Sequence, residues 1–195
     1  MGGLLGSENQ IFRRTKSNGD DKLIKTFIVT PIAYLLAIPL LLKRQLSYSV
    51  LANEIRIAAS RIGGAQIGKG VTLRPGVLMK GCKNICIGDN VFIGENSSLV
   101  AYGGKIIIGS DTIIADFVYI SGRNHRFRTK SKTISAQGYK SGDVVIGRDV
   151  WLAHGAQILA GSTISDGTVI SAGVIAPKFT NPYQVILQNG IGERI

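Results

Sequence analysis

The feature that most constrains this chain is an apolar residue that recurs every six positions from Ile67 onward. Since 45% of the chain is hydrophobic, about 7 of the 15 positions in the recurrence would be apolar by chance, yet all of them are. A fixed internal period of this kind indicates a stacked repeat architecture. The positions form four series: Ile67, Leu73 and Met79; Ile87, Ile93 and Leu99; Ile108, Ile114 and Ile120; and Ile146, Leu152, Ile158, Ile164, Ile170 and Ala176.

Small residues at a second set of positions show why the period is six residues long. A six-residue unit supplies one short strand and a corner, so three units return the chain above its start and stack parallel strands in three flat sheets. The apolar residue then points into the prism, and only a small residue fits near each corner. An alternating sandwich has period two and does not explain this spacing. Small or β-branched residues stand four positions after most of the apolar ones: Val71, Val77, Val91, Ser97, Thr112, Val118, Val150, Ala156, Ser162, Thr168 and Val174.

The remainder of the chain predicts an arm and a helical extension before the repeats. Residues 1–22 are polar and Gly-rich, so we expect a flexible basic arm. Residues 23–62 form the predicted extension, in which 46–62 have helical spacing, end at Gly63 and cap the repeats. Leu51, Ile55, Ile57 and Ala58 fall near one face of that helix. The repeat domain is expected over 63–195, with a protruding loop at 121–144 and a C-terminal tail.

Within the extension, residues 26–42 are uncharged and mostly apolar, with basic residues on both sides. This length is the lower limit for a membrane span, and Pro31 and Pro39 interrupt it. Three interpretations stay open: a helix packed on the repeats, an interfacial helix that contacts the membrane, or a true span.

The net charge and the cysteines limit the kinds of ligand that the chain is expected to bind. The net charge of +11 suggests an anionic partner, which could be a nucleic acid, a membrane surface or a phosphorylated ligand. No helix-turn-helix, zinc knuckle or aromatic RNA-binding pattern is present, so we expect no nucleic acid. Cys82 and Cys86 have no second cysteine pair and are expected to be free thiols, without a metal.

Residues 63 to 195 resemble the hexapeptide-repeat acetyltransferases, a family with a left-handed parallel β-helix fold. The resemblance is to the galactoside, maltose and xenobiotic branch, and it implies a homotrimer with active sites between subunits and acetyl-CoA as cosubstrate. The segments that carry it are Ile114–His125, Val145–Leu152 and Ser171–Lys178, together with Pro182-Tyr183 and Asn189-Gly190.

Two histidines compete for the role of general base. The resemblance implies His125, which follows Ile120 by five positions at the start of the protruding loop. A neutral histidine is suited to take the proton of an attacking hydroxyl, although an exposed histidine in a basic loop is by itself ordinary surface. His154, two residues after Leu152, resembles the catalytic histidine of the UDP-sugar acyltransferase branch, and it could instead lie at the trimer interface.

The resemblance also implies the coenzyme site. Trp151 matches the tryptophan that lines the coenzyme tunnel, and Lys178 matches a basic residue near the coenzyme phosphates. Backbone amides around Ala153, Ala172 and Gly173 would hold the pantetheine. The chain departs from the family pattern at Ala153, Ser171, Val174 and Asn189-Gly190.

The resemblance implies an O-acetyltransferase that moves an acetyl group from acetyl-CoA to a hydroxyl, and we expect that hydroxyl to belong to a sugar. We expect the enzyme to act in surface polysaccharide or lipid-linked glycan synthesis, in the cytoplasm or at the inner face of the cytoplasmic membrane. The departures favour one alternative, a non-enzymatic β-helix scaffold or anchoring module. A zinc enzyme of the carbonic anhydrase type needs three histidine ligands, and the chain has 2 histidines.

Overall fold

The computed structural model describes residues 42 and 45–193. The chain divides into two compact units, Met1–Gln45 and Leu46–Ile195, and the second contains all of the repeats. The predicted arm at 1–22, and the apolar segment 26–42 except for its last residue, lie outside the described residues. None of the described helices has the length and apolar character that a membrane crossing requires.

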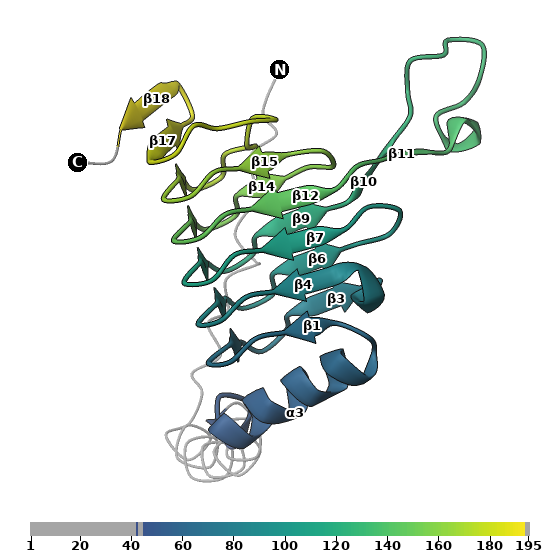
Figure 1. Cartoon of the computed structure of the whole chain (residues 1–195). Helices are drawn as coiled ribbons and strands as arrows, with labels where there is room; N and C mark the ends of the chain where they lie inside the picture. The colour runs from purple at the N-terminus through teal and green to yellow at the C-terminus, as the bar shows by residue number, and fades with distance from the viewer. Residues whose placement is uncertain (1–41, 43–44, 194–195) are drawn as a thin grey trace, which may run out of the picture. The chain divides into compact units, whose positions relative to one another are not determined.

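The repeats form a left-handed parallel β-helix with three sheets, as predicted (Figure 1). Sheet A contains β1 (Gln66–Ile67), β4 (Ile85–Ile87), β7 (Ile106–Ile108), β12 (Val144–Ile146) and β15 (Thr163–Ile164). Sheet B contains β2 (Thr72–Leu73), β5 (Phe92–Ile93), β8 (Ile113–Ile114), β13 (Trp151–Leu152), β16 (Val169–Ile170), β17 (Gln184–Leu187) and β18 (Gly190–Glu193), the last of them antiparallel. Sheet C contains β3 (Leu78–Lys80), β6 (Ser98–Val100), β9 (Tyr119–Ser121) and β14 (Gln157–Ile158).

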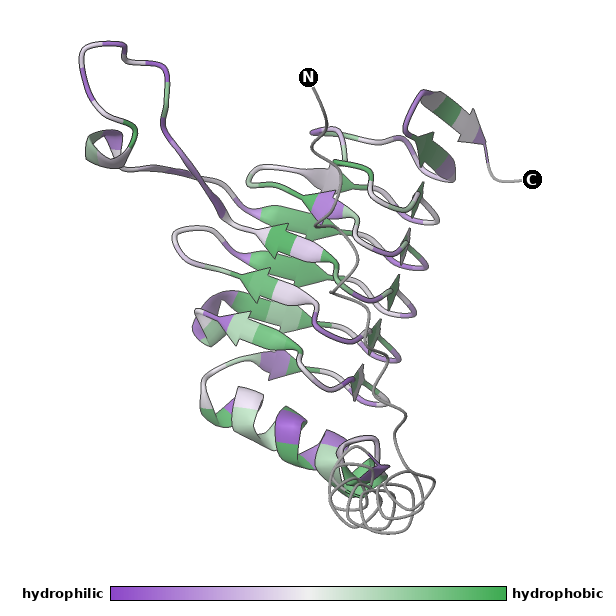
Figure 2. Ribbon diagram, turned by 180° about the vertical axis from the view of Figure 1, so that it is seen from behind, coloured by the Kyte–Doolittle hydropathy of each residue, from purple (hydrophilic) through white to green (hydrophobic). Residues whose placement is uncertain are grey.

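The six-residue period builds the core. Thirteen of its fifteen residues are buried, and Ile67 and Met79, in the first coil, are partly buried against them. Equivalent residues of successive coils pair in register, as Ile87, Ile108 and Ile146 do in sheet A. Figure 2 shows the result as hydrophobic strands separated by more polar corners. The small residues at the corners are buried as expected, except Val77 in the first coil, which is partly buried.

The four series of the sequence are parts of one continuous prism. Each break falls at the same edge, where the chain passes from sheet C to sheet A. The added residues there lie between β3 and β4, between β6 and β7, and between β9 and β12. The first contains a 3-10 turn, η2 (Cys82–Asn84), and both cysteines are free thiols. The third is the predicted protruding loop, which contains β10 (Arg123–His125), η3 (Ser135–Gln137) and β11 (Tyr139–Ser141).

Helix α3 (Val50–Ile62) lies within the range predicted to be helical and packs against the first coil. Ser49 caps its first turn by accepting from the Ala52 amide, and Gly63 ends it. The apolar face inferred from the sequence is wrong in part, because Leu51, Ile55 and Ala58 are exposed and only Ile57 is buried.

Polar residues of α3 explain that difference. The Nδ2 atom of Asn53 donates to the Val71 carbonyl at 3.1 Å, and its Oδ1 accepts from the Leu73 amide at 2.7 Å. Arg56 Nε donates to the Leu73 carbonyl at 2.7 Å. The first coil has no coil beneath it, so these side chains satisfy backbone groups that would otherwise lack partners. Burial, and then the nearby charge of Arg74, lower the pKa of Arg56 from its usual value.

Replacing Ile93 by alanine should lower the free energy of unfolding by about 2–5 kcal/mol, because the side chain is 0% exposed and its removal leaves a cavity. Ile134→Ala is the matched control, since Ile134 is 57% exposed on the protruding loop and its loss should cost less than about 0.5 kcal/mol. Chemical denaturation of both variants measures the difference. Equal costs would contradict the assignment of the six-residue period to the core.

Candidate active site

A groove of about 570 Å³ lies over the outer face of sheet C, beside the edge at which the protruding loop leaves the prism. Its floor consists of two rows of outward-facing side chains, and each row is set by the parallel register of β3, β6 and β9. One row is Leu78, Ser98 and Tyr119, and the other is Lys80, Val100 and Ser121. Tyr102, Arg123, Asn124, His125 and Tyr139 form its wall. The groove therefore joins the rigid sheet to residues that the insertions add.

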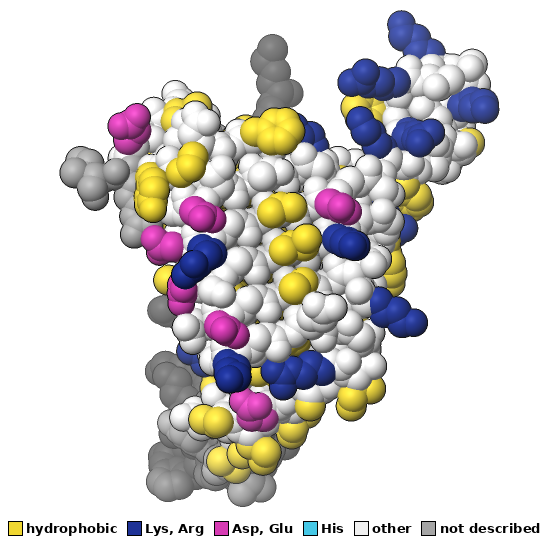
Figure 3. Space-filling model, viewed as in Figure 1, with side chains coloured by type: hydrophobic (Ala, Val, Ile, Leu, Met, Phe, Trp, Pro, Cys, Tyr) yellow, Lys and Arg dark blue, Asp and Glu magenta, His cyan; other side chains and the backbone are white. Residues whose placement is uncertain are grey.

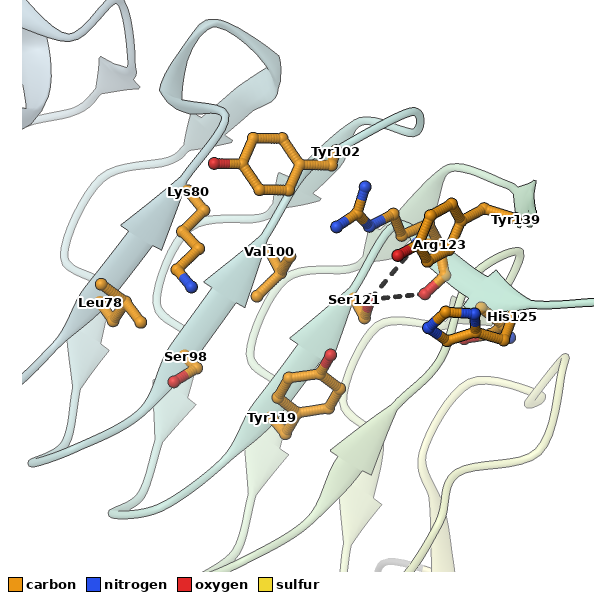
Figure 4. Close-up of a pocket in the computed structure, with 11 residues that line it drawn as sticks. Leu78, Lys80, Ser98, Val100, Tyr102, Tyr119, Ser121, Arg123, His125 and Tyr139 are labelled. Carbon is orange, nitrogen blue, oxygen red and sulfur yellow. Dashed lines mark hydrogen bonds between the residues drawn. The ribbon is translucent and has the colours of Figure 1, made fainter. Parts of the chain in front are cut away.

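Strands β10 and β11 form an antiparallel hairpin that positions His125. The register places His125 directly opposite Tyr139, and the two rings lie 4.3 Å apart between centroids. Arg123 is two residues from His125 on the same strand, so both side chains leave the same face of the hairpin. Figure 4 shows His125, Tyr139 and Arg123 grouped beside the third strand of the floor.

The guanidinium of Arg123 lies between two aromatic rings. Its Cζ atom is 4.8 Å from the centroid of Tyr102 and 4.2 Å from that of Tyr139. Ser121, which is 1% exposed, fixes the backbone below it, since its Oγ donates to the Arg123 carbonyl at 2.7 Å. Tyr139 thus touches both Arg123 and His125, and it links the cation to the imidazole.

A stack of three glycines anchors the base of the loop. The Gly142 amide donates to the Gly122 carbonyl at 3.0 Å, and the Gly122 amide donates to the Val100 carbonyl at 2.9 Å. A Cβ atom on Gly122 would lie 2.6 Å from the Gly104 carbonyl oxygen, and one on Gly104 would lie 2.3 Å from that of Gly142. No side chain fits at these positions without moving backbone, so the loop leaves the prism along one path.

His154 lies elsewhere, at the edge between sheets B and C. It is exposed, its ring lies tilted against Phe117 at 5.4 Å between centroids, and its carbonyl accepts from the Gly173 amide. Phe117 has a φ of 58°, a left-handed conformation that glycine and asparagine adopt at the equivalent corners. No described cavity that His125 lines includes His154.

The predicted coenzyme residues are spread over sheet B and two edges of the prism. Trp151 projects from sheet B and is 49% exposed. Ala153, Ala172 and Gly173 lie at the edge between sheets B and C, near His154. Lys178 lies at the edge between sheets C and A, where its Nζ donates to the Ala160 carbonyl. The described chain places these residues around one end of sheet C and does not bring them together in one cavity.

Sheet B is the face opposite the edge from which the hairpin leaves. Trp151 and His125 therefore point away from each other within one chain, and no described cavity contains both. Exposed apolar side chains follow the outer face of sheet B on neighbouring strands, among them Ile113 at 51% exposed and Trp151. Such a row is typical of a surface that meets another protein.

A second groove lies on the other side of His125. Asn124 and His125 line both grooves, and the second continues along the protruding loop. Figure 3 shows Lys and Arg side chains gathered on this loop. The basic side chains that line it are Arg126, Arg128, Lys132 and Lys140. Among the described residues, no group of three or more His, Cys, Asp or Glu could hold a metal ion.

The sequence did not single out most of the groove. Lys80, Tyr102, Tyr119 and Tyr139 come together only through the pairing of coils and of β10 with β11. A signal was present in the outward positions of β3, β6 and β9, which include Lys80, Ser98 and Tyr119. To recognise this signal in the sequence, one must first align coils that contain insertions of different length.

Substitution of Gly122 by alanine should lower the free energy of unfolding by about 1–3 kcal/mol, because the added methyl group would collide with backbone at the base of the loop. Gly190→Ala is the control, since a Cβ there meets nothing within 4 Å. Denaturation measures the cost, and amide hydrogen exchange over residues 122–142 measures the displacement of the hairpin. An unchanged exchange pattern would contradict the anchoring role of the glycine stack.

Known proteins of similar sequence are acetyltransferases. No family model matches it. The putative colanic acid biosynthesis acetyltransferase WcaF of Escherichia coli is 34% identical over 112 residues, which cover 57% of this chain and 58% of the relative. The match therefore spans little more than half the length of that relative.

Solved structures extend the comparison to the fold. A galactoside acetyltransferase in complex with coenzyme A is 27% identical, with a TM-score of 0.64 over 72% of this chain and 68% of that one. A maltose O-acetyltransferase from Clostridium difficile is 26% identical, with a TM-score of 0.62 over 78% of this chain and 82% of that one. The predicted resemblance to the galactoside and maltose branch of the hexapeptide-repeat acetyltransferases is confirmed.

Proposed function

We propose that this protein is an O-acetyltransferase that transfers the acetyl group of acetyl-CoA to a hydroxyl of a sugar, with His125 as general base. The observation that carries the proposal is the position of His125, in contact with Tyr139 in the wall of a groove beside the prism. The relatives are acetyltransferases, and one of the solved structures holds coenzyme A. The colanic acid relative supports an acceptor in a surface polysaccharide.

The reaction needs one base and no metal. The acceptor hydroxyl attacks the thioester carbonyl of acetyl-CoA while His125 takes its proton. The tetrahedral intermediate collapses, the carbon–sulfur bond breaks, and the proton passes from the imidazolium to the departing thiolate. The products are the acetyl ester and free coenzyme A, and the imidazole is neutral again.

We also propose that the complete site forms between subunits of a homotrimer. Trp151 on sheet B points away from His125 in one chain, so the coenzyme residues of one subunit would serve the base of its neighbour. The exposed apolar row of sheet B offers a surface for that neighbour. Trp151, Lys178 and the amides around Ala153, Ala172 and Gly173 would hold the coenzyme. Membrane contact through 26–42 stays a prediction from the sequence.

The scaffold alternative makes a different prediction for coenzyme binding. A scaffold would bind no coenzyme A, whereas an acetyltransferase binds it even when its base is removed. His154, in contact with Phe117 at another edge, is the competing base. Turnover of variants that lack one or the other histidine therefore identifies the base.

His125→Ala should lower kcat for acetyl transfer by about 10²–10⁴-fold, the contribution of a positioned general base, without loss of coenzyme A binding. A thiol-release assay with acetyl-CoA and a panel of sugar acceptors measures turnover, and calorimetry measures coenzyme binding. His154→Ala is the matched control and should retain turnover. Loss of turnover in His154→Ala alone would move the base to the other edge, and absence of coenzyme A binding in the wild type would support the scaffold.

Mixing two inactive variants tests the shared site. Trimers assembled from His125→Ala and Trp151→Ala subunits contain some interfaces with both native residues, so they should regain a fraction of wild-type turnover. Each variant alone should remain inactive or nearly so, because every interface then lacks one residue. Turnover no higher than that of the separate variants would contradict a site shared between subunits.

A further inference from the structure

We propose that the groove over sheet C selects an acceptor that carries a negative charge, a carboxylate or a phosphate, on or beside the sugar that receives the acetyl group. The inference rests on the proposed function and names its substrate class. Arg123 and Lys80 are the residues that would bind the charge.

The charge of the groove is entirely positive. Its lining includes Lys80 and Arg123 and no Asp or Glu side chain. Within residues 45–193 neither cation forms an ion pair, and the guanidinium of Arg123 donates no hydrogen bond. Cations without a carboxylate partner in a groove attract an anion and gain charge-assisted hydrogen bonds when one binds.

The geometry of Arg123 suits recognition of an anion. Tyr102 and Tyr139 contact the guanidinium within 4.8 Å and 4.2 Å of their centroids, which restricts its motion before any ligand binds. Within residues 45–193 the guanidinium N–H groups donate no hydrogen bond, so these donors are open to a ligand. Those donors match the two oxygens of a carboxylate or phosphate, which a lysine in the same place would not do.

The position of Arg123 relative to the base limits where the charge can be. Arg123 and His125 are two residues apart on one strand, so their Cα atoms are separated by about 6.6 Å on the same face. Lys80 is in register with Ser121 two strands away, a separation of roughly 9.6 Å between Cα atoms. Arg123 is thus within one or two sugar units of the hydroxyl that His125 would activate, and Lys80 lines the same groove.

A second groove beside His125 is also positively charged and would also favour an anionic acceptor. The second groove continues from Asn124 and His125 along a wall of four basic side chains. A charged glycan could therefore keep favourable contacts on both sides of the base. Within one chain the predicted coenzyme residues Trp151, Ala172 and Gly173 line neither groove, and KM for acetyl-CoA separates the acceptor from a coenzyme that a neighbouring subunit brings to His125.

The test compares three small acceptors: methyl glucuronide, glucose 1-phosphate and the neutral methyl glucoside. Calorimetry should give a Kd at least about tenfold lower for one of the charged sugars than for methyl glucoside, as expected for a charge-assisted hydrogen bond. The charged sugar that binds more tightly identifies the anion as a carboxylate or a phosphate. Equal binding of all three sugars, or no binding of any, overturns the proposal.

Variants assign the preference to the groove. Arg123→Gln should abolish it, and Arg148→Gln should keep it, because Arg148 carries the same charge but pairs with Asp111 on another edge of the prism. Lys80→Gln is the second groove variant, since this exposed side chain can be replaced without disturbing the hairpin, and it should weaken the preference at least threefold. An unchanged preference in both groove variants overturns the proposal.

The KM values for the acceptor and for acetyl-CoA show whether the cations bind the acceptor or the coenzyme phosphates. With the bound sugar as acceptor, Arg123→Gln should raise KM for the acceptor and leave KM for acetyl-CoA unchanged. A rise in KM for acetyl-CoA alone would assign the cations to the coenzyme phosphates and overturn the proposal. Selective binding without any acetyl transfer would instead contradict the proposed function, whereas transfer to all three sugars with equal kcat/KM would contradict only the charge preference.

Discussion

The stacking of identical positions in successive coils is the interaction on which this structure depends. Ile93 of β5 lies in register with Leu73 of β2 and Ile114 of β8, and all three are almost fully buried. Burial of these side chains holds each coil at a fixed height and rotation above the last. Because side chains alternate between the two faces of a strand, the outward residues are brought into register by the same contacts. The floor of the groove therefore follows from the core.

The same constraint explains where new structure is tolerated. An insertion inside a strand would shift every later residue by one position and expose the core, so added residues accumulate at a corner. In this chain they accumulate at the edge between sheets C and A, and there they grow from a 3-10 turn in the first coil to a hairpin in the third. Catalytic and binding residues gather on such loops when a rigid scaffold positions them. We propose such roles for His125 and Arg123, and Tyr102 packs against Arg123.

Features that depend on residues close together in the sequence could be predicted, and features that depend on distant residues could not. The period of six is local, so the three sheets, the buried residues and the protruding loop followed from it. The residues that pack helix α3 on the first coil did not, because Asn53 and Arg56 bind backbone carbonyls and amides that only the open end of a prism leaves unpaired. Apolar spacing alone had favoured Leu51 and Ile55, which are exposed.

The groove was harder to predict because its residues meet across coils of unequal length. Lys80 and Ser121 share a row although insertions of different size separate them, and Tyr139 reaches His125 only after the hairpin pairs. His125 itself was predicted from the resemblance, and its contact with the Tyr139 ring was not. The topology adds one further consequence, since a prism has three faces and a loop from one edge cannot reach the face opposite it. His125 and Trp151 occupy that edge and that face, so a reaction that needs both requires a second copy of the chain.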